Sequence, residues 1–285
     1  MFRRKTVMKK LNRVLSLSAA AALALSLTAC SGGTSGTADT PAADNTSAST
    51  GGSGDTYTVA VIKQMDHASL DEIADAIAAR LDEIAAENGI TIQYEVTSGQ
   101  GDQTVLRQLA DQAIADGVDA IIPIATTAAQ VAAVSAEESQ TPVVFAAISY
   151  PETADLTGID YVTGTSDALD TNLILDMMLA QNPELQSVGL LYSLSEPNSE
   201  VPIADAKAYL DEKGIAYTEA TANTNDEVIA AASSLIADGV DAVFTPTDNI
   251  IMAAELAIYE DFINAGIPHY TGADSFVRNG AFATC

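Results

Sequence analysis

Two aspartates are the side chains best placed to hold a positively charged ligand group. Asp248 and Asp274 each follow an apolar run and two small or turn-forming residues. A carboxylate in such a position can bind an ammonium group, whereas hydroxyl and amide donors can bind a carboxylate. Candidate donors are Thr126, Thr127, Asn198 and Ser199. The helices predicted to begin close to them would add free backbone N–H groups for the same anion.

Little in the sequence could catalyse a reaction. It has no Gly-x-x-x-x-Gly-Lys-Ser/Thr phosphate loop, no Gly-x-Ser-x-Gly turn and no cluster of His and Cys for a metal. Catalysis would depend on His67, because His269 lies in an apolar run and is expected to be structural. A lone histidine in a loop is more often a ligand contact or a surface residue than a base. We therefore expect a binding protein with no catalytic residue, cofactor or metal.

One unit of structure is used twice in the chain. The heptad IADGVDA at residues 114–120 returns at 236–242, which is 236 minus 114, or 122, positions later. Around each copy, an amphipathic run closes at a glycine and an apolar run follows. This is the pattern of a helix, its C-terminal stop and a buried strand. Repetition of that pattern is typical of parallel α/β sheets.

The predicted fold class is α/β, with two doubly wound parallel-sheet (Rossmann-like) lobes. The elements expected in the first copy are strand 57–62, helix 70–87, strand 90–96, helix 104–116, strand 120–124, helix 128–138 and strand 143–147. Those expected later are helix 169–181, strand 188–192, helix 201–213, strand 216–220, helix 226–238, strand 242–245, helix 250–265 and strand 268–271.

The loops that follow these strands are the expected binding region. Right-handed crossovers bring all strand-to-helix loops of a parallel sheet to one edge, where ligands bind. Two such edges facing one another would form a cleft. Because loops are polar in any case, a polar loop residue alone does not establish a role.

The N-terminal region has the features of an export signal. Six basic residues precede the apolar segment 15–27, and the segment closes in Leu27-Thr28-Ala29-Cys30, which resembles the lipobox of bacterial lipoproteins. That resemblance implies a signal peptide at 1–29 and acyl chains, such as palmitate, on Cys30 at a membrane surface. An ordinary cleaved signal is the alternative. The Ser, Gly and Thr-rich residues 30–55 are expected to form a disordered tether.

Charge and cysteine content exclude other classes. Without the signal, 12 minus 6, or six, basic residues remain against 39 acidic ones, a formal charge of 6 minus 39, or −33. Such a chain would be repelled by nucleic acid. The other cysteine is Cys285, so no disulfide framework is expected.

Several segments carry a family resemblance. They are Asp66-His67, Leu70-Asp71, QGDQ at 100–103, IATTAAQ at 124–130, EPNS at 196–199, PTDN at 246–249 and ADS at 273–275. Together, over residues 57–284, they resemble the ABC-transporter substrate-binding lipoproteins that include tryptophan and tyrosine binders. The resemblance implies a type I periplasmic-binding-protein fold and, as partners, an ABC permease and its ATPase. Thr127 and Ser195 depart from the proline and glycine that members often have.

The expected ligand-binding residues combine the loops with this resemblance. They are His67, Gln103, Thr126, Thr127, Tyr150, Asn198, Ser199, Asp248, Asn249, Asp274 and Ser275. Among them His67 and Tyr150, together with Phe276, could line an apolar side-chain pocket. The expected role is an extracytoplasmic solute-binding lipoprotein that delivers an amino acid, possibly aromatic, to an importer. A sugar or nucleoside receptor and a sensory lipoprotein are the alternatives, although a sugar site typically stacks on tryptophan, which is absent.

The lobe boundaries follow from the repeat. The first lobe is expected at 56–150 plus 276–285, and the second at 151–275. The helix 169–181 should have a counterpart near 169 plus 125 to 181 plus 125, or 294–306, beyond Cys285. We therefore expect the first lobe to lack its final helix, as in a truncated chain.

Overall fold

The computed structural model describes residues 54–285. The chain divides into the units Met1–Gly51 and Gly52–Cys285, and the second contains all the described residues. The predicted signal peptide, Cys30 and nearly all of the predicted tether lie outside them. Within the described residues, no helix combines the length and apolar character needed to cross a membrane.

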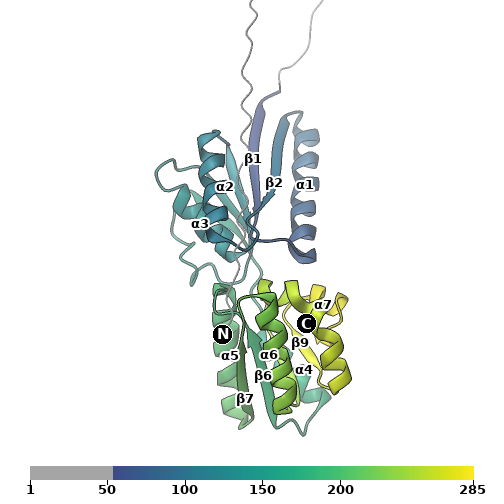
Figure 1. The fold of residues 1–285 in the computed structure, drawn as a ribbon. Helices are drawn as coiled ribbons and strands as arrows, with labels where there is room; N and C mark the ends of the chain where they lie inside the picture. The colour runs from purple at the N-terminus through teal and green to yellow at the C-terminus, as the bar shows by residue number, and fades with distance from the viewer. Residues whose placement is uncertain (1–53) are drawn as a thin grey trace, which may run out of the picture. The chain divides into compact units, whose positions relative to one another are not determined.

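The first lobe is built on a sheet of five parallel strands in the order β2-β1-β3-β4-β5 (Figure 1). Its elements are β1 (Thr56–Lys63), α1 (Ala68–Asn88), β2 (Thr91–Ser98), α2 (Gln103–Ala115), β3 (Ala120–Ile124), α3 (Thr126–Ser135), β4 (Val143–Ile148) and β5 (Val162–Ser166). Helix α1 packs on one face of the sheet, and α2 and α3 pack on the other. The sheet is therefore doubly wound.

The second lobe repeats this arrangement in the parallel order β7-β6-β8-β9-β10. Its elements are α4 (Thr171–Gln181), β6 (Ser187–Tyr192), α5 (Pro197–Lys213), β7 (Ala216–Thr221), α6 (Asn225–Asp238), β8 (Ala242–Thr245), α7 (Asn249–Ala265), β9 (His269–Thr271), α8 (Asp274–Arg278) and β10 (Ala283–Thr284). One face carries α6 and α7, and the other carries α4 and α5. The predicted fold class is confirmed in both lobes.

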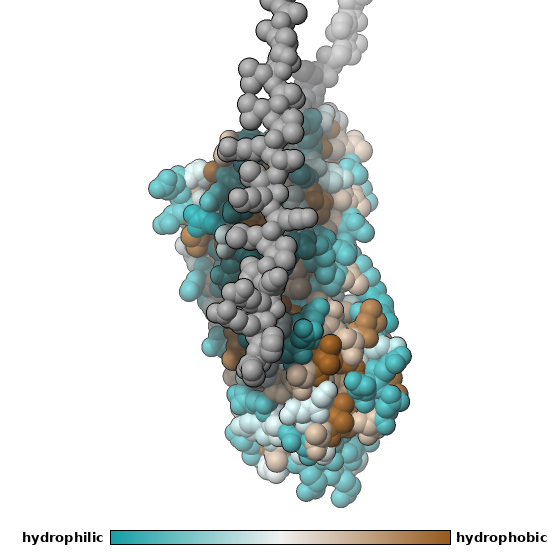
Figure 2. All heavy atoms as spheres, in the orientation of Figure 1, coloured by the Kyte–Doolittle hydropathy of each residue, from teal (hydrophilic) through white to brown (hydrophobic). Residues whose placement is uncertain are grey.

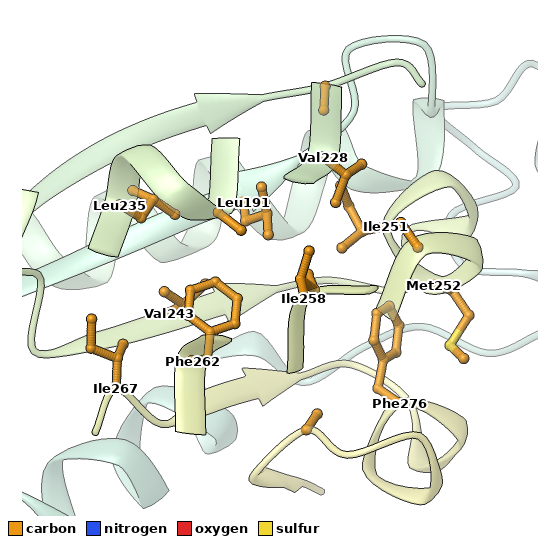
Figure 3. Packing of buried hydrophobic residues seen from close by; sticks show 14 of the residues in the cluster. Leu191, Val228, Leu235, Val243, Ile251, Met252, Ile258, Phe262, Ile267 and Phe276 are labelled. Carbon is orange, nitrogen blue, oxygen red and sulfur yellow. The ribbon is translucent and has the colours of Figure 1, made fainter. Parts of the chain in front are cut away.

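Each lobe has apolar cores on both faces of its sheet. The largest cluster lies beneath α6 and α7 and includes Leu235, Val243, Ile258 and Phe262 (Figure 3). On the outside, Figure 2 shows hydrophilic residues over much of the visible face, with apolar ones among them. Some exposed apolar side chains are normal at a protein surface.

The repeated heptad has the same function in both lobes. Gly117 and Gly239 have φ of 74° and 69°, a conformation that ends the preceding helix at low steric cost. The side chains of Asp119 and Asp241 then accept hydrogen bonds from the start of the first strand of each sheet. Asp119 Oδ2 accepts from Thr58 N at 2.7 Å, and Asp241 Oδ2 accepts from the backbone N–H groups of residues 186 and 187 at 2.8 and 2.9 Å. The heptad thus fixes how the third strand enters each sheet.

The last strand of each lobe differs from the prediction. Val162–Ser166 was expected as part of the second lobe, but β5 pairs with β4 in the first sheet. Residues 276–285 were expected in the first lobe, but β10 pairs with β9 in the second. The offset relates the two strands, since 284 minus 122 is 162. Each is the fifth, edge strand of its own sheet, and neither has the long apolar run that marks a buried strand.

Some helices also begin earlier than predicted. α3 begins at Thr126 rather than at residue 128, and α5 begins at Pro197 rather than at residue 201. The short helix α8 was expected to be a loop. These differences matter because they place Thr126, Thr127, Asn198 and Ser199 in first helical turns.

Candidate binding site

A cavity of about 320 Å³ lies at the carboxyl ends of strands from both sheets. That volume is at the lower end of the range for small-molecule sites. Its walls come from α1 and the start of α3 in the first lobe and from the starts of α5, α7 and α8 in the second. The predicted binding residues that line it are His67, Thr126, Asn198, Asp248, Asn249, Asp274 and Ser275.

Hydrogen bonds join the two lobes around this cavity. His67 Nε2 lies 3.0 Å from Asn249 Oδ1, and Ser69 Oγ donates to Ser275 Oγ at 2.5 Å. Ser149 Oγ lies 3.2 Å from Thr247 Oγ1. The two strand-end edges therefore face one another, and a ligand in the cavity would touch both lobes.

Four predicted residues do not line the cavity. Gln103 is exposed at the start of α2, and the hydroxyl of Tyr150 donates to the carbonyl of Leu169 at 3.1 Å. Thr127 and Ser199 are buried and do not reach the cavity surface. Phe276, predicted to line an apolar pocket, does line the cavity.

Asp248 and Asp274 have very different surroundings. Asp248 is 1% exposed, and its carboxylate accepts from Ser193 N at 2.7 Å, Ser199 Oγ at 2.7 Å and Ile251 N at 3.0 Å. It is the N-cap of α7. The Asp274 side chain is 77% exposed and lies 3.5 Å from Arg278. These contacts disfavour the predicted role of either as an ammonium partner.

Asp167, which was not predicted, is a better acceptor for a cation. It lines the cavity at an accessible position, and its Oδ1 accepts from Ser149 Oγ at 3.2 Å. Desolvation raises its pKa. Within residues 54–285 it forms no ion pair with lysine, arginine or histidine. It directly follows β5, so the strand-end rule would have selected it had that strand been predicted.

Gln64 and Glu196 were also not predicted to contact a ligand, and both are 3% exposed. They join the lobes through a hydrogen bond of 2.5 Å from Gln64 Nε2 to Glu196 Oε1. Burial, followed by the nearby charge of Asp248, raises the pKa of Glu196 to about 8. The sequence gives no sign of this, because both residues lie in polar loops.

Most helix N-termini at the cavity lack a capping side chain at the N-cap, whereas Asp248 caps α7. Helices α2, α4 and α6 each have a capping side chain, whereas α1, α3 and α8, whose first residues line the cavity, have none. Ala125 and Ala147, which also line it, have positive φ of 76° and 58°. Backbone strain of this kind concentrates at functional sites. Uncapped N–H groups are suited to an anion.

The cavity also has an apolar wall. Leu70, Ile73 and Ala76 of α1 form one side, and Met252 and Phe276 form part of another. Figure 3 shows Met252 and Phe276 towards one end of the core cluster. The site thus combines an acceptor for a cation, donors for an anion and an apolar surface.

Known proteins share this architecture. Residues 58–285 match the family described as ABC transporter substrate binding protein. A tyrosine-binding protein of Clostridioides difficile (strain R20291) is 27% identical over 232 residues, which are 80% of this chain and 66% of that protein. The chain therefore spans slightly less than two thirds of that relative.

Solved structures agree with this match. An ABC domain from Streptococcus pneumonia in complex with L-Trp is 26% identical, with a TM-score of 0.74 over 81% of this chain and 78% of that one. A leucine binding protein of Thermotoga maritima, at 17% identity, has a TM-score of 0.60 over 79% of this chain and 66% of that one, and shows the fold alone. With two parallel-sheet lobes around one cavity, and a family match from β1 to the last residue, the chain belongs to the ABC transporter substrate-binding proteins with the type I periplasmic-binding-protein fold.

Proposed function

We propose that the protein captures an amino acid, most suitably an aromatic one, between its two lobes and delivers it to an ABC permease and its ATPase. It acts on the extracytoplasmic face of the membrane, held by acyl chains on Cys30. Asp167 binds the ammonium group, and the uncapped start of α3 binds the carboxylate. The apolar wall holds the side chain.

The observation that carries the proposal is the accessible carboxylate of Asp167, which has no ionic partner among residues 54–285. A carboxylate with raised pKa and no cation gains most from a bound ammonium group. Thr126 and Ala125, at the start of α3, line the same cavity. A zwitterion satisfies both kinds of group at once, whereas a sugar or a nucleoside has no ammonium for Asp167.

The relatives support an aromatic ligand. One is described as a tyrosine-binding protein, and the other contains L-Trp. In this chain, Phe276 and Ile73 offer apolar surface suited to a flat ring. The anchor at Cys30 is supported by the sequence alone, and mass spectrometry of the mature protein would identify its acyl chains.

Substitution of Asp167 tests the proposal. We expect Asp167→Asn to weaken binding of L-tryptophan or L-tyrosine by about 1.5–3 kcal/mol, because the ammonium group loses its charged hydrogen-bond acceptor. Glu152→Gln, at an exposed position in the same segment between β4 and β5, should bind as the wild type does. Titration calorimetry measures both. Unchanged binding by Asp167→Asn, or binding of sugars and nucleosides in place of amino acids, would contradict the proposal.

A further inference from the structure

Glu196 is a buried carboxyl group at the boundary between the two lobes. It is the N-cap of α5 in the second lobe, and its Oε1 accepts a hydrogen bond of 2.5 Å from Gln64 Nε2 in the first lobe. Its Oε2 accepts another of 2.6 Å from Asn249 Nδ2. Asn249 in turn contacts His67 of the first lobe. The Glu196 carboxyl therefore depends on both lobes for its partners.

The amides around Glu196 have fixed orientations. Thr127 N donates to Gln64 Oε1 at 3.1 Å, so the Gln64 amide nitrogen faces Glu196. Asn198 Nδ2 donates to the carbonyl of Thr247 at 2.6 Å, so Oδ1 is the other end of that amide. This oxygen is buried without a donor. The hydrogen bonds that Glu196 accepts from Asn249 and Asn198 favour its charged form, whereas burial and the charge of Asp248 favour the neutral form and have the larger effect. A neutral carboxylic acid, which can donate as well as accept, would supply the donor that Asn198 Oδ1 lacks.

Within the described residues, the cationic side chains near Glu196 do not balance a negative charge on it. The titratable and charged groups around it are Asp248 of α7, His67 of the first lobe, and Glu200 and Lys207 of α5. Lys207 is paired with Glu219 at 2.6 Å. Burial lowers the pKa of His67, so its imidazole is uncharged at neutral pH. An ionised Glu196 would therefore face Asp248 without compensation.

We propose that Glu196 is a positioning residue that takes up a proton when the two lobes close on a ligand. The inference rests on the proposed function, because ligand capture drives the closure. As a neutral acid, Glu196 accepts from Gln64 and Asn249 and donates its O–H to Asn198, and so holds two residues of the cavity wall. When the lobes separate, Glu196 loses Gln64 and meets water, where the carboxylate is the stable form.

The direction of the pH dependence follows from this linkage. In the open form the pKa of an exposed glutamate is about 4.3. In the closed form burial and Asp248 raise the pKa of Glu196 to about 8. Protonation of Glu196 therefore favours closure most below the open-form pKa. This contribution is lost as the pH rises through the closed-form pKa. Between the two, affinity should weaken by about tenfold per pH unit.

Calorimetry of the full chain with L-tryptophan or L-tyrosine, in buffers of different ionisation enthalpy, measures affinity and proton uptake together. Near pH ~6.5 we expect the wild type to take up about one proton more per ligand than Glu196→Gln, because His67, whose pKa is lowered by burial, releases protons equally in both proteins. Glu196→Gln should lose the decrease of affinity with rising pH that Glu196 causes. Glu200→Gln, exposed one turn further along α5, is the matched control and should resemble the wild type. Asp167 is present in all three proteins, so its titration cancels in the comparison.

The outcomes separate this inference from the proposed function. Equal proton uptake by the wild type and Glu196→Gln would overturn the inference and leave the function standing. If no amino acid binds, the proposed function fails, and thermal unfolding without ligand decides the inference. The wild-type midpoint should then fall relative to that of Glu196→Gln between pH ~5 and ~8. Parallel profiles would contradict the inference.

Discussion

The two lobes share one scaffold but differ where the third strand of each sheet ends. In the first lobe one residue, Ala125, separates β3 from α3, whereas three residues separate β8 from α7 in the second. The offset of the repeat aligns Thr126 with Asp248, since 248 minus 122 is 126. Asp248 caps its helix, whereas the N-cap of α3, Ala125, has no capping side chain and Thr127 N–H in the first turn donates to Gln64 Oε1. The same unit thus produces a helix N-terminus without a cap of its own in one lobe and a capped one in the other.

This difference assigns different tasks to the lobes. The groups suited to the two charges of an amino acid, the start of α3 and Asp167 after β5, both belong to the first lobe. The second lobe contributes Met252 and Phe276, which are apolar, Asn249, which is hydrogen bonded, and Asp274 and Arg278, which are paired with each other at 3.5 Å. We infer that the first lobe holds the ligand's charges and that the second closes over it.

The largest effect on stability should come from removing the side chain that caps α7 in the second lobe. Asp248→Ala deletes a helix cap and leaves Ser193 N–H and the Ser199 hydroxyl buried without an acceptor. We expect a loss of about 3 kcal/mol in the free energy of unfolding, measured with urea. Asp274→Ala, at an exposed position, should change it by less than about 0.5 kcal/mol. If Asp248→Ala were as stable as the wild type and yet failed to bind ligand, Asp248 would be the ammonium partner that the sequence predicts.

A smaller effect should come from the heptad aspartates. Asp241→Ala removes bonds to two backbone N–H groups and to Ser187 Oγ, whereas Asp119→Ala removes bonds to the backbone and hydroxyl of Thr58. We expect losses of about 2 and about 1 kcal/mol in the free energy of unfolding. Equal losses would mean that the two copies fix their sheets equally strongly.

The Asp241 effect should also depend on pH. The bond from Gln186 N–H, the largest cause, and those from Ser187 lower the pKa of Asp241. Because the pKa of Asp241 is lower in the folded state, its carboxylate stabilises the fold above the unfolded-state pKa of about 3.9. This stabilisation is lost as the pH falls through the folded-state pKa. Denaturant unfolding of the wild type and Asp241→Asn should therefore converge in acid. A stability difference that persists below about pH 2 would contradict this explanation.

Most of the scaffold could be predicted because apolar periodicity reports burial directly. β3 and β8 have the predicted bounds, 120–124 and 242–245, and all strand pairs of both sheets are parallel. β5 could not be predicted in the same way. It contains one large apolar residue, Val162, and most of its residues are exposed. An edge strand of this kind has no pattern that separates it from a loop.

The candidate site was only partly predictable. The strand-end rule selected His67, Thr126 and Asn198, which line the cavity, because the rule depends on topology alone. It could not distinguish Asp248 from Asp167. The Asp248 carboxylate already accepts three hydrogen bonds from the protein, whereas Asp167 accepts one from Ser149. That property depends on tertiary contacts such as Ser199 with Asp248, which join residues 49 positions apart. Sequence patterns locate a site more readily than they reveal which of its groups are already satisfied.

The smallest effect on stability should come from changing Ala125, the single residue that connects β3 to α3 in the first lobe. Ala125 has φ 76° and ψ 160°, a region occupied almost only by glycine, which costs about 1–3 kcal/mol. Ala125→Gly relieves that strain, but it loses a buried methyl group, about 0.8 kcal/mol, and makes the unfolded chain more flexible, by about 0.4–1 kcal/mol. At their midpoints the three terms leave a change of about 0.5 kcal/mol in favour of the variant. Ala132→Gly, inside the same helix, has no strain to relieve and should destabilise by about 1.5–2 kcal/mol. Urea unfolding of both variants decides the matter, because equal destabilisation would show that the backbone at Ala125 stores no strain.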